Sequence, residues 1–112
     1  MALRVFLITY DLDREGHDGA RYFFNHGYFP ESHGQWISVQ KSVRLLLTGG
    51  DAKSLADDFD SHVGRSGHFA VIDVTESGFS GRAKPEVWEW LRKARAEALA
   101  STGRATGPGG GA

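Results

Sequence analysis

The chain has 112 residues and a mass of 12.2 kDa, enough for one domain with a buried core and no disulfide or metal staple. Hydrophobic residues make up 40% and charged residues 24%, which is typical of a globular domain, and the absence of cysteine excludes disulfides, thiol nucleophiles and cysteine zinc sites. The net charge of −1 is not that of a strongly basic nucleic-acid binder. No apolar run approaches the roughly 18 residues of a membrane span, so we expect a cytoplasmic protein with no signal peptide and no membrane partner.

The first third of the chain predicts a strand, a loop and a short helix. Residues 3–10 (LRVFLITY) are apolar on both alternation sets, which predicts a strand covered on both faces. The polar stretch 11–18 predicts a loop, and Asp18 is placed to cap a short helix over residues 19–26. Residues 27–34 contain a proline and two glycines and predict a further loop.

The middle of the chain predicts two strands and an amphipathic helix. Strand-like runs over residues 35–40 and 42–47 pivot between them in a tight hairpin or a bulged bend. Asp51 follows two glycines and predicts the N-cap of a helix over residues 52–63. The apolar residues of that helix follow helical spacing: Ala52, Leu55, Ala56, Phe59 and Val63.

The last part of the chain predicts a strand, a loop, a helix and a tail. Residues 69–74 (FAVIDV) predict the strand and residues 76–84 the loop. Pro85 suits the first turn of the final helix. One face of that helix carries Val87, Leu91, Ala94 and Ala98. The glycine-rich segment 101–112 predicts a disordered tail that follows a single domain of residues 1–100.

This order of elements predicts an α+β fold, the ferredoxin-like βαββαβ plait. Its four-stranded antiparallel sheet has two helices on one face, and an additional C-terminal helix follows. The strands carry apolar residues on both faces, for example Phe6 beside Leu7. Two helices cover only one face, so we expect either a second protomer or the helix with Trp88 and Trp90 to cover the other.

Several short motifs resemble the CRISPR-associated protein two family, the small dimeric subunit of spacer acquisition. Residues 6–13 (FLITYDLD) resemble its opening strand and acidic turn, and residues 39–43 (VQKSV) its bend between the second and third strands. Residues 78–81 (GFSG) and 88–91 (WEWL) are more similar to related ferredoxin-like proteins outside CRISPR loci. The resemblance implies a homodimer associated with RNA or DNA and with another protein subunit.

Asp11 and Asp13 are the candidate metal ligands. Aspartates two apart at a strand end can point to one side and hold Mg²⁺, which orients a scissile phosphate. The alternative is that both are turn residues bonded to their own backbone, which we favour for Asp13. The resemblance implies that Asp11 is catalytic and holds metal together with its symmetry mate near a dimer axis.

The basic residues of the final helix are the candidate phosphate contacts. Arg92, Lys93 and Arg95 would meet RNA or DNA, or else form a solvated helix end whose charge suits the helix dipole. The five histidines have no metal-binding spacing. Two functions follow: a non-catalytic homodimeric platform for nucleic acid or protein, and a magnesium-dependent endonuclease that acts through Asp11 at the dimer interface.

Overall fold

The computed structural model describes residues 2–26, 35–65 and 67–111, with side chains up to Ser101. The loop predicted over residues 27–34 lies outside the described residues. The elements are β1 (Leu3–Asp11), α1 (Arg14–His26), β2 (Gln35–Gln40), β3 (Val43–Gly49), α2 (Ala52–Val63), β4 (His68–Asp73) and α3 (Pro85–Gly111).

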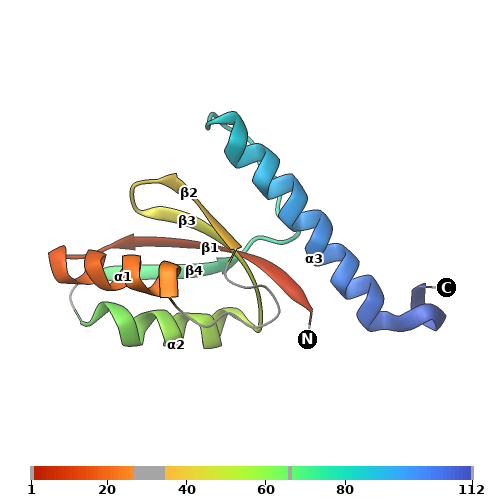
Figure 1. Cartoon of the computed structure of the whole chain (residues 1–112), viewed down its shortest axis with the longest axis horizontal. Helices are drawn as coiled ribbons and strands as arrows, with labels where there is room; N and C mark the ends of the chain where they lie inside the picture. Colours follow the sequence, from red (N-terminus) through yellow and green to blue (C-terminus); the bar gives the residue numbers. More distant parts are fainter. Residues whose placement is uncertain (1, 27–34, 66, 112) are drawn as a thin grey trace.

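The strands form one antiparallel sheet in the order β2-β3-β1-β4. Helices α1 and α2 lie together on one side of this sheet, and α3 crosses the other side (Figure 1). The fold is therefore α+β, a ferredoxin-like plait with an additional C-terminal helix, as the order of elements predicted. No helix of the described segments is long and apolar enough to span a membrane.

Alternation along β1 separates two cores. Phe6, Ile8 and Tyr10 face α1 and α2, where they meet aromatic residues of both helices. Leu3 and Val5 point to the opposite face and are buried under α3. The apolar residues on both faces of this strand are thus explained by two separate layers of helices.

Helix α1 begins earlier than predicted. Asp13 Oδ1 accepts a hydrogen bond from the amide of Gly16 at 2.8 Å and so caps a helix that starts at Arg14. The expected loop over residues 11–18 and the expected cap at Asp18 were wrong. A Cβ on Gly19 would lie 2.0 Å from the carbonyl oxygen of His62, so this glycine permits close contact between α1 and α2 rather than a loop.

Helix α2 and the hairpin agree with their predictions. Asp51 caps α2 through a capping box with Ser54: Asp51 Oδ1 accepts from the Ser54 amide at 2.8 Å. Strands β2 and β3 are joined by a turn at residues 41–42, where the bend was expected, and their pairing is irregular just before it, between Ser38 and Gln40.

Helix α3 starts at Pro85, and its predicted apolar face is buried against the sheet. It continues through Gly111, beyond Ser101, where we expected it to give way to a disordered tail. Ser101 itself contacts the sheet: its Oγ accepts from the Leu3 amide at 2.8 Å and donates to the Ala98 carbonyl at 2.7 Å.

Candidate functional site

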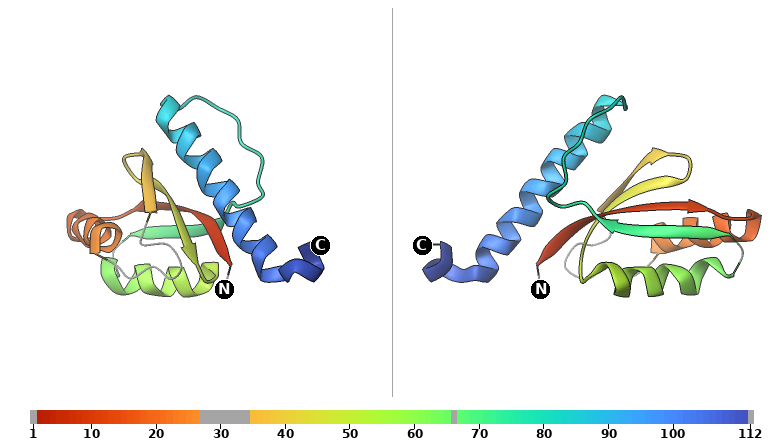
Figure 2. Two further views of the ribbon diagram at one scale, coloured as in Figure 1. Left: turned by 45° about the vertical axis from the view of Figure 1, so that its right-hand side comes forward. Right: turned by 180° about the vertical axis from the view of Figure 1, so that it is seen from behind.

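Helix α3 covers only part of the second sheet face. It crosses the sheet near the start of β1, while the other ends of β1 and β4 extend away from it (Figure 2). Val5 is fully buried under α3, but Leu7 on the same face is half-buried and its partner Ile72 on β4 is 49% exposed. We name the uncovered region the open half-face; it consists of Leu7, Thr9, Val43, Ala70 and Ile72, which strand pairing places on one side.

Asp11 lies at the end of the open half-face. Its side chain is exposed, and pairing of β1 with β4 places it opposite His68. Both residues line a shallow hollow of about 260 Å³, together with Thr9 and Ala70. The adjacent chain needs glycine, because Gly67 has φ +88° and a Cβ there would lie 2.2 Å from the Asp11 carbonyl oxygen.

Asp13 is a turn residue bonded to its own backbone, which was the alternative to a role as a metal ligand. Its carboxylate caps α1 and so is engaged with the backbone of its own turn. In the described part of the chain, no three His, Cys, Asp or Glu residues are grouped closely enough to hold a metal ion.

The three predicted phosphate contacts have different environments on α3. The Arg95 Nε donates to the Thr75 carbonyl at 2.8 Å, and its guanidinium carbon lies 5.1 Å from the Phe79 ring centroid. The Lys93 Nζ lies 3.5 Å from a Glu89 oxygen in an exposed ion pair. Arg92 is exposed. Arg92 and Arg95 line a second hollow of about 470 Å³, whose lining does not include Lys93.

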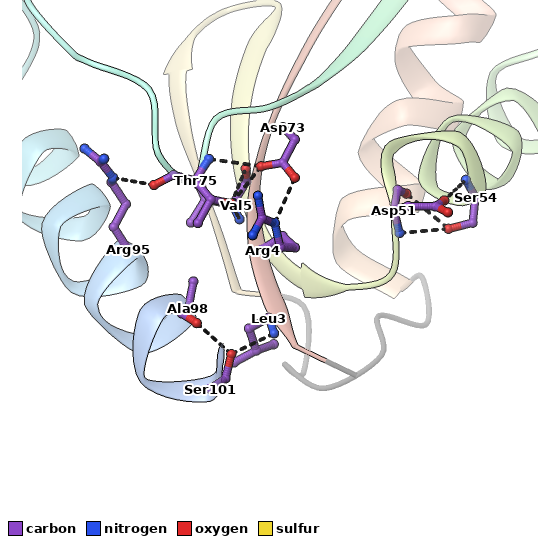
Figure 3. A network of polar contacts seen from close by, with 10 residues as sticks. All are labelled: Leu3, Arg4, Val5, Asp51, Ser54, Asp73, Thr75, Arg95, Ala98 and Ser101. Atoms are coloured by element: carbon purple, nitrogen blue, oxygen red, sulfur yellow. Dashed lines mark hydrogen bonds and ion pairs between the residues drawn. The ribbon is translucent and has the colours of Figure 1, made fainter. Parts of the chain in front are cut away.

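A polar network joins the start of β1 to β4 and to α3 (Figure 3). Strand β4 ends opposite Phe6, and beyond this point the Val5 amide donates to Thr75 Oγ1 at 2.9 Å. Thr75 Oγ1 in turn donates to Asp73 Oδ1 at 2.7 Å, and Arg4 Nε donates to Asp73 Oδ2 at 2.8 Å. Beyond the end of β4 the backbone of β1 therefore stays hydrogen-bonded, because the Val5 carbonyl also accepts from the Val74 amide at 2.8 Å.

The network also sets the charge state of Asp73. Burial by itself raises the pKa of this carboxyl, but the hydrogen bonds from Arg4 and from the amide and hydroxyl of Thr75 outweigh burial. The pKa of Asp73 is therefore below its ordinary value of 3.8. Asp73 is ionised at neutral pH and holds Arg4 and Thr75 in place.

Two functional candidates escaped the sequence analysis. His68 becomes notable only because strand pairing places it opposite Asp11, 57 positions earlier in the chain. Phe79 comes from the loop before α3 and meets Arg95 across the 470 Å³ hollow. Neither contact has a local sequence signal, since each joins residues from separate elements.

The fold and the open half-face define the class of protein, a ferredoxin-like plait with one helix laid partly over its second sheet face. No protein-family model, curated protein or solved structure matches this chain. The resemblance to CRISPR-associated protein two accordingly stays a prediction.

Proposed function

We propose that the chain is a cytoplasmic homodimeric binding platform, associated with nucleic acid as its resemblance to CRISPR-associated protein two implies. Its partner is RNA, DNA or another protein subunit. The observation that supports this proposal is the open half-face, which leaves Leu7 half-buried and Ile72 49% exposed beside a well-packed core. Aliphatic side chains aligned on a sheet face gain free energy when a second surface removes them from water.

A second copy of the chain suits this surface because a two-fold axis brings the same patch from both protomers together. Strands β1, β3 and β4 present the patch as a rigid, paired surface, so association would order little additional chain. Asp11 and His68 carry the polar groups at its end, where they would form part of the rim of the contact.

The alternative function is a magnesium-dependent endonuclease, and the exposure of Asp11 beside a hollow favours it. Asp11 from each protomer would hold the ion, which on binding would orient a phosphate and activate water. We place this function second because Asp13 is engaged as a helix cap and no three His, Cys, Asp or Glu residues of the described segments are grouped closely enough to hold a metal ion.

Incubation of the protein with labelled single- and double-stranded RNA and DNA, with and without millimolar Mg²⁺, distinguishes the two functions. A platform leaves every substrate intact under both conditions. Magnesium-dependent cleavage by the wild type that is lost in Asp11→Asn would establish the endonuclease instead. Asn preserves the size of the side chain while it replaces the charged carboxylate by a neutral amide, and thermal melting would confirm that the variant is folded.

A further inference from the structure

Helix α3 carries a second apolar stripe beside the one buried on the sheet. Trp88, Ala96 and Leu99 follow helical spacing, and Phe79 adds an aromatic ring from the preceding loop. We name this surface the outer groove; it is the hollow of about 470 Å³ lined by Phe79, Trp88, Leu91, Arg92, Arg95, Ala96 and Leu99. The groove follows about three turns of helix, or about 16 Å.

Much of the lining of the outer groove is apolar, as in a surface that packs against another part of a protein. Leu99 is 52% exposed, one of the large hydrophobic side chains that the described structure leaves most open to solvent. Ala96 is small and exposed, so it lets another backbone approach the helix closely. Trp88 is half-buried and connects the groove to the core beneath α3. These features match the way in which one helix receives another along a hydrophobic groove.

The charges of the outer groove are of one sign. Among the described residues, the charged side chains that line it are Arg92 and Arg95, and none of its described lining residues is acidic. Arg95 is held by the Thr75 carbonyl and by the Phe79 ring, so its cation has a fixed position without any bound partner. A partner therefore gains by presenting carboxylates beside its apolar residues.

The composition of the outer groove favours a protein partner over nucleic acid. Bases bind by stacking on exposed flat rings, whereas Leu99 and Ala96 offer aliphatic surface and Trp88 is half-buried. We propose that the outer groove binds an amphipathic helix of a protein partner, with apolar residues at i, i+3 or i+4, and i+7, flanked by Asp or Glu. This inference rests on the proposed platform function and names its partner.

A phage-displayed library of helical peptides, selected on the purified full-length protein, tests the proposal. We expect enrichment of peptides with that apolar spacing and flanking carboxylates. Binding of the enriched synthetic peptides, measured by fluorescence anisotropy, should weaken at least tenfold in Arg92→Glu and in Leu99→Ser. Lys93→Glu is the matched control, because it makes the same change of charge one position along and lies off the groove; it should bind as the wild type does.

Several results would overturn the proposal. These are a failure to enrich peptides, enriched peptides that bind Arg92→Glu and Leu99→Ser normally, and equal weakening in Lys93→Glu. A single-stranded oligothymidylate that binds the wild type and loses binding in Arg92→Glu, with no peptide bound there, would assign the groove to nucleic acid. Sedimentation of the same variants keeps this test separate from dimerisation, since the substituted residues lie on α3 and not on the open half-face.

Discussion

Asp73 shows how one carboxylate joins segments that are distant in the sequence. It accepts hydrogen bonds from Arg4 on β1 and from Thr75, whose carbonyl in turn accepts from Arg95 on α3. Because ionised Asp73 is stabilised in the folded chain, its pKa is lower there than in the unfolded chain. The unfolded chain then binds more protons in the acid range, and acid shifts the equilibrium toward it.

We expect that the free energy of unfolding of Asp73→Asn falls less steeply than that of the wild type as the pH is lowered into the acid range. The contribution of Asp73 is complete above the ordinary pKa of 3.8 and is lost as the pH falls through the lower folded-state value. At neutral pH the variant should lose no more than about 1 kcal/mol, because 35% of the carboxylate side chain is exposed and solvent screens the pair.

Urea unfolding across the acid range measures this effect. The free energies of wild type and Asp73→Asn should converge as the pH falls from the ordinary pKa of 3.8 through the lowered pKa of folded Asp73. Asp57→Asn, whose ion pair with Lys53 is mostly exposed, serves as the control. A constant difference between wild type and Asp73→Asn at every pH would contradict the assignment.

At the scale of elements, the contact between α1 and α2 depends on glycine. A Cβ at Gly19 would overlap the backbone of His62, and one at Gly16 would lie 3.2 Å from the carbonyl oxygen of Val63. The ends of the two helices therefore approach more closely than any larger residue allows. The aromatic core, including Phe23 against Phe59 with ring centroids 5.1 Å apart, is built around this approach.

Gly19→Ala should destabilise the fold although alanine is the better helix former. The higher helix propensity of alanine is worth about 1 kcal/mol, whereas backbone overlap forces the helices apart at a cost of about 1–3 kcal/mol. We expect a net loss of up to about 2 kcal/mol by thermal or urea unfolding. Gly78→Ala, where an added Cβ meets no atom within 4 Å, should be neutral. Equal stability of both variants would show that α1 and α2 do not pack closely at Gly19.

These glycines show why the sequence predicted some elements and missed others. Helix α2 and the start of α3 were predicted because their caps and apolar spacing are local signals: Asp51 with Ser54, and Pro85. The start of α1 was missed because Gly16 was interpreted as a loop residue, and its packing role depends on a helix about 45 residues later.

The candidate site divides in the same way. The exposed position of Asp11 at the end of β1 follows from the strand pattern. The hydrogen bond by which Asp13 caps α1 supports the interpretation of Asp13 as a turn residue. The sequence located the basic residues of α3 but did not show how their environments differ. Arg95 differs from Lys93 because it contacts Thr75 and Phe79, which lie on another segment of the chain. The packing of separate elements against one another has no signature in a local pattern.

The anchorage of α3 gives a prediction for the end of the chain. Deletion of residues 102–112 should leave the melting temperature nearly unchanged, because the segment has no apolar periodicity and is rich in glycine. Ser101→Ala should lower the free energy of unfolding by about 1 kcal/mol, because the Leu3 amide loses its acceptor. Differential scanning calorimetry compares the two. A truncation that costs more than Ser101→Ala would show that the terminal segment contributes to the fold.

At the scale of the whole molecule, the sheet has one face covered by two helices and the other covered in part by one. Burial of both faces at the start of β1 contrasts with exposure of Ile72 beside Leu7 farther along. The homodimer proposal follows from this imbalance, since removal of an aligned aliphatic surface from water supplies the driving force. The lining residues of the outer groove on α3 are not part of the open half-face.

Sedimentation equilibrium at micromolar concentration tests the homodimer most directly, with Ile72→Lys compared against Tyr22→Lys. Both substitutions place a charge at an exposed hydrophobic residue, 49% exposed at Ile72 and 58% at Tyr22, but Tyr22 lies on α1, away from the open half-face. We predict that wild type and Tyr22→Lys sediment at twice the 12.2 kDa chain mass and that folded Ile72→Lys sediments at the mass of one chain. A single-chain mass for the wild type, or a dimer that Ile72→Lys leaves intact, would contradict it.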